Sequence, residues 1–185
     1  MKLPAQRMNE VVQQVEQEGV VACPAEAVWG LTCDPLSEDA VLQLLAMKHR
    51  PISKGLIIVA ASSAMLGPLL KPLDSAQRNE LELSWPGPNT WLVPNRGLYP
   101  DWITGESDEI AIRVTSAPAL ALLSYRLGRP VVSTSANPAG AQPARHSFQV
   151  VRYFGRGLVR APGVVGLEAS PSTIRRVGTG EVLRA

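Results

Sequence analysis

The chain has 185 residues, 45% of them hydrophobic, and a formal net charge of +2. This composition predicts one globular domain over residues 1–185, because the chain is long enough to bury a core of its own. The longest apolar run, residues 56–61, is too short to cross a bilayer, and the first residues lack the apolar segment of a secretory signal. Two cysteines and two histidines argue against a disulfide framework and a histidine zinc site, so we expect a cytoplasmic protein without a membrane partner.

The charge is unevenly distributed along the chain. Residues 115–185 carry nine arginines and two glutamates, whereas residues 1–114 carry nine basic and fourteen acidic side chains. This asymmetry favours an anionic ligand, either a nucleotide or RNA. A solvated basic face would produce the same count, so this alternative stays open.

Apolar periodicity, capping residues and breaks at glycine or proline predict alternating helices and strands. In chain order we expect a helix over residues 8–19, strands over 20–23 and 28–31 with a break at Pro24, a helix over 37–50, a strand over 56–60, a helix over 74–83, a strand over 91–93, a polar loop over 97–109, a strand over 110–114, a helix over 118–127, a strand from 131, a helix capped by Ser147 up to 155, and a hairpin over 173–177 and 181–184. The alternation predicts an α/β fold, and the terminal hairpin indicates a mixed sheet with flanking helices.

The second half centres on a strand, a helix and a strand that begins at Val131. Such a unit predicts two parallel strands joined by a right-handed crossover helix. The second strand runs into the polar side chains of residues 133–137, at the end of a strand where ligands collect in open parallel sheets. Hydroxyls and an amide there can donate to phosphate oxygens without adding charge. A strand end capped by a Ser/Thr turn is the plainer alternative.

The densest cationic cluster contains Lys48, Arg50 and Lys54. Pro51 ends the helix and biases Arg50 toward an extended conformation, so Lys48 and Arg50 can point at one anion. The alternative is that these cations only satisfy the carboxyl end of the helix, an interaction worth about 0.3–1 kcal/mol. Arg113 is a different case: it lies within an apolar strand, where a cation is unfavourable unless it meets a ligand or an acid.

Familiar nucleotide and hydrolase motifs are absent. The sequence has no G-x-x-x-x-G-K-[ST] loop and no G-x-G-x-x-G after a strand, so side chains must hold any triphosphate. A serine-hydrolase interpretation of Ser133 or Ser135 is weak, since neither lies in a G-x-S-x-G turn.

Five motifs together resemble the YrdC-like family. They are Lys48-x-Arg50-Pro51, Trp85-Pro86-Gly87-Pro88-x-Thr90, Ala111-Ile112-Arg113-Val114, Ser133-Thr134-Ser135-Ala136-Asn137 and Pro171-Ser172-Thr173-Ile174. Their order matches the family from about residue 20 to residue 184, and the length is similar to that of its short, single-domain bacterial members. The resemblance implies a twisted open mixed sheet around a concave basic cavity. It also implies an enzyme, a nucleotidyltransferase that converts L-threonine, bicarbonate and ATP to threonylcarbamoyl-adenylate and pyrophosphate.

The resemblance also implies roles for individual residues. Nucleotide binding would fall to Lys48, Arg50, Lys54, Ser133, Ser135, Asn137, Ser172 and Arg184. Threonine binding would fall to Arg113 and to the loop positions Ala25 and Ala27. Mg²⁺ is expected on the ATP phosphates, although no carboxylate stands out as its ligand. The product would pass to a downstream tRNA threonylcarbamoyl transferase complex for modification of adenosine 37. Because carbamate and mixed anhydride are labile in water, we expect a closing segment at residues 97–109 or 155–166.

The loop Pro24-Ala25-Glu26-Ala27 departs from the Pro-Thr-Glu-Thr that the family commonly has. Without the two hydroxyls, either Arg113 and backbone groups suffice for threonine, or the preference for the amino acid is relaxed. Glu26 is then either a catalytic base or a loop carboxylate, and we expect the latter. Two rival functions remain: an RNA-binding or ribosome-maturation module with a direct RNA contact, and a paralogue that makes another carbamoyl-adenylate.

Overall fold

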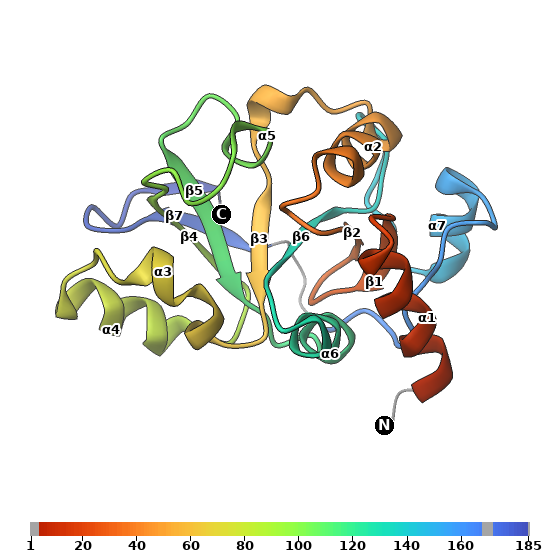
Figure 1. Ribbon diagram of the computed structural model, residues 1–185, viewed down its shortest axis with the longest axis horizontal. Coiled ribbons are helices and arrows are strands. Elements are labelled where there is room, and N and C mark those ends of the chain that lie inside the picture. The colour runs from red at the N-terminus through yellow and green to blue at the C-terminus, as the bar shows by residue number, and fades with distance from the viewer. Residues whose placement is uncertain (1–3, 168–171, 185) are drawn as a thin grey trace.

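An eight-stranded sheet runs through the part of the chain that the structure describes, residues 4–167 and 172–184 (Figure 1). The structure is a computed structural model. In sheet order the strands are β1 (Val21–Pro24), β2 (Trp29–Thr32), β6 (Val131–Ser135), β3 (Ile57–Ala60), β5 (Glu109–Val114), β4 (Asn89–Pro94), β7 (Thr173–Arg176) and β8 (Val182–Arg184). β3 pairs in parallel with β5, and β4 with β7, whereas the other neighbours are antiparallel. The expected mixed α/β fold is confirmed. Residues 1–3, on which the absence of a secretory signal was judged, and Pro171 of the last motif lie outside the described residues.

Helices flank the sheet on both faces (Figure 1). They are α1 (Ala5–Glu16), α2 (Glu38–Lys48), α3 (Gly67–Leu70), α4 (Ser75–Ser84), α5 (Asp101–Thr104), α6 (Pro118–Leu127), α7 (Ser147–Phe154) and the 3₁₀ turns η1 (Ile52–Lys54) and η2 (Ser63–Leu66). The caps explain two of their starts, since the Ser37 hydroxyl accepts from Ala40 N, and Asp74 and Gln77 form a capping box. None of the described helices has the length and apolar character that a membrane crossing requires.

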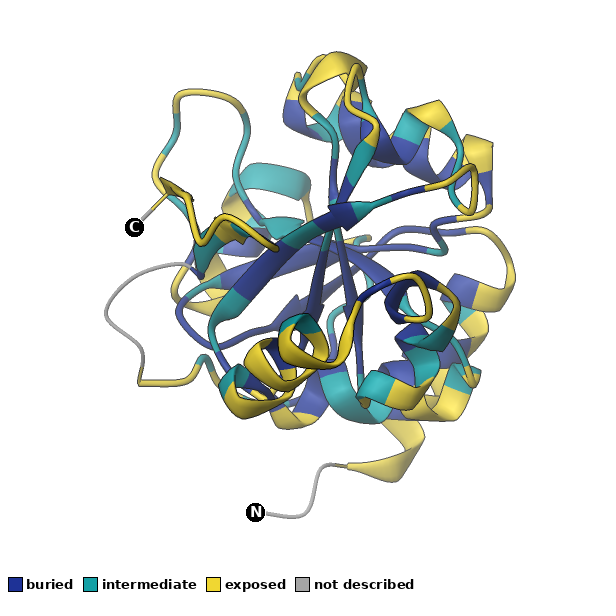
Figure 2. Cartoon of the chain, turned by 90° about the vertical axis from the view of Figure 1, so that its left-hand side faces the viewer, coloured by how far each residue is buried: buried dark blue, intermediate teal, exposed yellow. Residues whose placement is uncertain are grey.

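Two apolar clusters cover opposite faces of the sheet, because successive strand side chains point to opposite sides. Ile58, Ile112 and Val132 belong to the larger cluster, which also contains buried residues of α2 and α3 and Leu81 of α4. Val59 and Val131 face the other way, onto α1 and α6. Figure 2 shows the buried residues concentrated in the strands, with exposed residues on the outer helix surfaces and the C-terminal hairpin.

The expected parallel pairing of β5 and β6 is wrong. β3 lies between them, parallel to β5 and antiparallel to β6, so β5 and β6 run in opposite directions. The reason is the direction of α6, which crosses the end of the sheet and is seen almost end-on in Figure 1. The chain therefore enters β6 at the end where it leaves β5. Consequently Ser133 lies beside Ile57 at the start of β3, not at the end of a parallel strand.

The two segments expected to close the site are packed against the body of the protein. Residues 97–109 contain α5, in which Ile103 is fully buried and accepts at its carbonyl from Leu56 N at 2.8 Å. Residues 155–166 run along β1, where Ala22 N donates to Val159 O at 2.9 Å and Ala161 N donates to Ala22 O at 2.8 Å. Residues 97–109 therefore contain a short helix that the sequence prediction missed, and the closing role expected for either segment stays a prediction.

Several element ends differ from the sequence prediction, among them those at Pro24, Gly19 and Ser147. Pro24 does not break the first strand but forms its last pair, with Trp29. α1 ends at Glu16 instead of Gly19, and Glu18 then adopts a positive φ of 59°. His146, not Ser147, is the N-cap of α7, and the Gln149 side chain accepts from His146 N at 2.9 Å.

Candidate active site

A cavity of about 570 Å³ lies on the same sheet face as α1 and α6, over strand residues that these helices do not cover. Ser133, Ile57, Ala111 and Leu92 lie opposite one another on β6, β3, β5 and β4, and these four residues line its floor. Its volume falls within the roughly 300–1,000 Å³ of sites that enclose a small organic ligand. The register of the four strands thus joins side chains that are far apart in the sequence into one continuous cavity floor.

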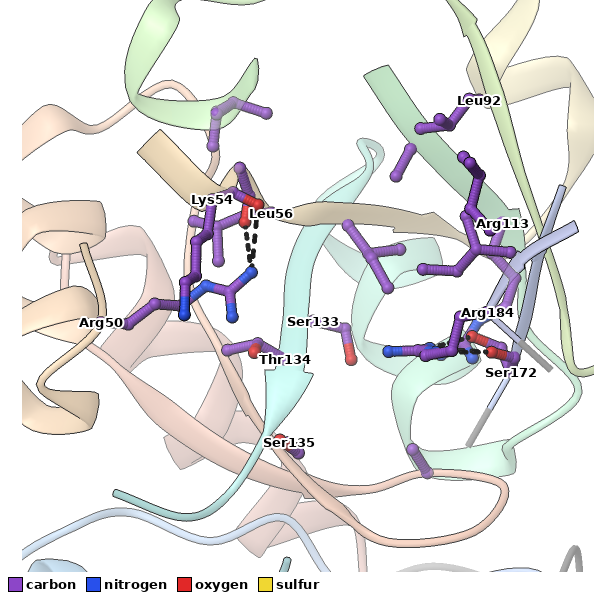
Figure 3. Close-up of a pocket in the computed structure, with 18 of the residues that line it drawn as sticks. Arg50, Lys54, Leu56, Leu92, Arg113, Ser133, Thr134, Ser135, Ser172 and Arg184 are labelled. Atoms are coloured by element: carbon purple, nitrogen blue, oxygen red, sulfur yellow. Dashed lines mark hydrogen bonds between the residues drawn. The ribbon is translucent and has the colours of Figure 1, made fainter. Parts of the chain in front are cut away.

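Arg50 and Lys54 lie at one end of the cavity (Figure 3). Arg50 Nη2 donates to Lys54 O at 3.1 Å and to Gly55 O at 2.8 Å, while its buried Nε has no hydrogen-bond partner among the described residues. Burial lowers the pKa of Arg50. The guanidinium is therefore oriented by carbonyl oxygens, and its charge remains available to an anion.

Arg113, Arg184 and Ser172 lie at the other end, with Ser133 between the two groups (Figure 3). Arg184 Nη2 donates to Ser172 O at 2.8 Å and to Ser172 Oγ at 3.2 Å, and Thr90 Oγ1 donates to the same hydroxyl at 2.8 Å. Burial lowers the pKa of Arg184, and the charges of Arg113 and Arg50 lower it further. Arg113 and Arg50 thus repel Arg184, so an anion bound between these cations would be favourable.

Arg113 is 6% exposed and Glu26 is 5% exposed, and both line the cavity. Arg113 Nη2 lies 3.3 Å from Glu26 Oε2. Glu26 Oε1 accepts from Thr115 Oγ1 at 2.6 Å and from Ser116 N at 3.2 Å. Burial lowers the pKa of Arg113, and the charge of Glu26 opposes that shift. The acid that a cation within an apolar strand requires is therefore Glu26, which lies in the loop between β1 and β2 as expected and is also a buried ion-pair partner.

Lys48 and Asn137 are near the cavity but do not line it. Lys48 Nζ donates to Ser135 O and, at 3.0 Å, to Asn137 O, so it holds the polar run that follows β6. Burial lowers the pKa of Lys48 to about 8, with a smaller contribution from Arg50. The Asn137 amide donates to Pro138 O and Ala141 O at 3.0 and 2.8 Å, which fixes the following turn. The structure thus brings the cations of residues 48–54 next to the polar residues 133–137, as expected. Lys48 and Asn137, however, support the lining from beneath and do not belong to it.

The remaining predicted positions lie in the lining. They are Ala25, Ala27, Ser133, Ser135 and Ser172. Both alanines are at least nine-tenths buried and offer no hydroxyl to a ligand. The cavity contains four cations, Arg50, Lys54, Arg113 and Arg184, and two carboxylates, Glu26 and Glu109. Its expected basic character stays a prediction.

Two polar pairs were missed from the sequence. Glu26 with Thr115, and Thr90 with Ser172, each join side chains more than eighty residues apart. The sequence signal for the first pair was Glu26 itself, a single carboxylate in an apolar stretch before β2. Such a carboxylate needs a partner, and Arg113 in its apolar strand was the natural one. The only sequence signal for the second pair was that Thr90 and Ser172 each lie in one of the five family motifs.

The described residues provide no group of three His, Cys, Asp or Glu side chains that would hold a metal ion. The two lining carboxylates are both engaged, Glu26 with Arg113 and Glu109 with Arg176. Mg²⁺ takes oxygen ligands from carboxylates, phosphates and water. The described lining therefore does not fit a protein-held Mg²⁺ site.

Comparisons with known proteins agree over nearly the whole chain. The family model Sua5_yciO_yrdC, described as "Telomere recombination", matches residues 13–185. The chain is 50% identical over 179 residues to a threonylcarbamoyl-AMP synthase of Cellvibrio japonicus, covering 96% of this chain and 95% of that protein. It is 48% identical over 179 residues to one of Stutzerimonas stutzeri, covering 96% of each.

Two solved structures have the same arrangement of elements. Sua5 of P. abyssi complexed with L-threonine matches with a TM-score of 0.85 and 27% identity, over 98% of this chain and 54% of that one. The chain therefore spans about half the length of that protein. YciO of E. coli matches with a TM-score of 0.84 and 21% identity, over 98% of this chain and 90% of that one, and this likeness concerns the fold alone.

Proposed function

The chain belongs to the Sua5/YciO/YrdC family, and from this premise we propose that it is a threonylcarbamoyl-AMP synthase. It would convert L-threonine, bicarbonate and ATP to L-threonylcarbamoyl-adenylate and pyrophosphate, which makes it a nucleotidyltransferase. The observation that carries the proposal is about 50% identity, over nearly the full length of both chains, to proteins with that name. The cavity supports it, because cations lie at both ends of one connected space.

The two ends of the cavity suit different parts of the substrates. Arg113 would pair with the α-carboxylate of threonine, since a guanidinium matches a carboxylate in charge and shape. Arg50 and Lys54 would neutralise the ATP phosphates at the opposite end. Ser133 and Ser135 lie between the ends and would donate to the nucleotide, with Ser172 and Arg184 closing the far side. Lys48 and Asn137 would support this surface from below.

The chemistry requires little acid–base machinery. The neutral amine of threonine adds to carbon dioxide and loses a proton to water, or condenses with bicarbonate and releases water. Either route gives a carbamate, which is already an anionic nucleophile. A carbamate oxygen attacks the α-phosphorus of ATP and forms a P–O bond, while the bond to the β-phosphate oxygen breaks and pyrophosphate leaves with the electron pair. The protein contributes positioning and charge neutralisation, and a cavity that excludes water protects both labile species.

Further proposals concern the surroundings of this reaction. Mg²⁺ would travel with the ATP phosphates, because the described lining does not supply its own carboxylates for the ion. The product would pass in the cytoplasm to a tRNA threonylcarbamoyl transferase complex. An RNA-binding module is the less favoured alternative, since no observation on the described surface favours RNA over a nucleotide.

Pyrophosphate release tests the proposal. With ATP and bicarbonate, wild-type protein should release pyrophosphate only when threonine is added, and Arg50→Ala should reduce the rate. Arg156→Ala is the matched control, because that exposed arginine does not line the cavity and its loss should leave the rate unchanged. Threonine-independent release, or none, would contradict the proposal. Salt-sensitive RNA affinity without release would favour the RNA-binding module.

A further inference from the structure

One carboxylate oxygen of Glu26 accepts no hydrogen bond from the described residues, although it is ion-paired with Arg113. Oε1 accepts two hydrogen bonds, from Thr115 Oγ1 and Ser116 N. Oε2 is buried and accepts none among the described residues, although Arg113 Nη2 approaches to 3.3 Å. Arg113 Nε is also buried and has no hydrogen-bond partner in the described part of the chain. Buried polar atoms are usually hydrogen-bonded, so this pair is incomplete on both sides.

The incomplete pair faces the cavity. Glu26 and Arg113 both belong to its lining, and both are more than nine-tenths buried. A buried ion pair is stabilising only when further hydrogen bonds satisfy its remaining donors and acceptors. The protein does not supply these bonds within the described residues, so a ligand that did so would bind favourably. Such a ligand must bring an anion to the guanidinium and a cationic N–H donor to the carboxylate.

An α-amino acid zwitterion has both groups on one carbon atom. We propose that Glu26 is a specificity-determining residue that accepts the α-ammonium of the amino-acid substrate at Oε2, while Arg113 takes the α-carboxylate. This inference rests on the proposed function and adds to it the group that recognises the amine. Thr115 and Ser116 hold the carboxylate through Oε1, which leaves Oε2 able to accept a further hydrogen bond.

No other described group in the lining is equally suited to the ammonium. Glu109 uses both carboxylate oxygens on Arg176 Nε, at 3.2 and 3.0 Å. Ala25 and Ala27 offer no side-chain acceptor. Recognition of the amine therefore falls to Glu26, and the preference it creates is for α-amino acids over α-hydroxy acids of the same shape.

Binding without turnover tests the inference. The probes are L-threonine and 2,3-dihydroxybutanoate of matching configuration, in which a hydroxyl replaces the ammonium, measured by calorimetry in the absence of ATP. Wild-type protein should bind threonine about 10- to 100-fold more tightly, the range of a charge-assisted hydrogen bond. Glu26→Gln should remove most of this preference, by weakening threonine and leaving the hydroxy acid almost unchanged.

Glu109→Gln is the matched control, because it neutralises the other lining carboxylate and should keep the preference. Equal weakening of both ligands by Glu26→Gln would mean that Glu26 only maintains Arg113, and would overturn the inference. If that variant fails to fold, the wild-type comparison still decides, since equal affinity for the two probes contradicts an ammonium site. Preference for threonine without pyrophosphate release would instead overturn the proposed function alone.

Discussion

Arg113→Met should destabilise the protein because it leaves the Glu26 carboxylate buried without its counter-ion. The two side chains are 8% and 5% exposed, so solvent cannot replace the lost charge. Removal of one partner from such a pair costs about 3–5 kcal/mol. Arg184 repels Arg113, and relief of that repulsion places the expected loss near the lower limit. With a urea dependence of about 2 kcal/mol per molar, the unfolding midpoint should fall by roughly 1.5 M.

The assay is urea unfolding followed by fluorescence, since the chain has four tryptophans. The double variant Arg113→Met/Glu26→Gln should recover much of the loss, because the unpaired buried charge is then gone. Its threonine-dependent pyrophosphate release should nevertheless stay low, which separates folding from substrate binding. If the single variant unfolds at the wild-type midpoint, or if the double variant is as unstable as the single one, the ion-pair argument is refuted.

Four further predictions concern Lys48, Ile103 and Ser172. Because burial lowers the pKa of Lys48 to about 8 and its protonated amine holds Ser135 O and Asn137 O beneath the lining, affinity for a non-hydrolysable ATP analogue should fall as pH rises from 7 to 9. Lys48→Arg keeps the charge and should abolish this fall. Between pH 8 and the ordinary Lys value of 10.5 the folded protein binds fewer protons than the unfolded chain, so the contribution of Lys48 to the unfolding free energy should rise with pH, an increase that Lys48→Met lacks. Ile103→Ala should lower the unfolding free energy by about 2–5 kcal/mol in urea titration, since Ile103 is fully buried; a change below 1 kcal/mol would mean that α5 is not packed as described. Ser172→Ala removes the hydroxyl shared by Thr90 and Arg184 and should cost about 1–3 kcal/mol, and an unchanged thermal midpoint would contradict this contact.

Local chemistry made much of the fold predictable. The capping box of α4, the Ser37 cap of α2 and the glycine turn of the terminal hairpin act within a few residues, so the sequence contains all of their partners. The mixed sheet followed from the alternation of elements and from that hairpin. The relative direction of β5 and β6 did not, because it depends on how α6 crosses the end of the sheet, which no periodicity records.

In the site, too, features set by local sequence were predictable, whereas contacts between distant segments were not. Arg113 was predictable as a functional cation because an unpaired charge within an apolar strand needs a partner. Its partner Glu26 was not assigned, since the two residues meet only after the β1–β2 hairpin folds against the end of β5. Lys48 and Arg50 were grouped by spacing, but the left-handed conformation of His49 between them separates their directions. One therefore lines the cavity, and the other supports the polar run from beneath.

The central claim is that one cavity brings threonine, a carbamate carbon and the α-phosphate of ATP together. Mass spectrometry of the products formed from ¹³C-labelled bicarbonate, L-threonine and ATP tests it directly. We predict an adenylate that contains both threonine and the labelled carbon, formed in step with pyrophosphate. ATP consumption that yields AMP or ADP without an adduct containing threonine and the label would contradict the account.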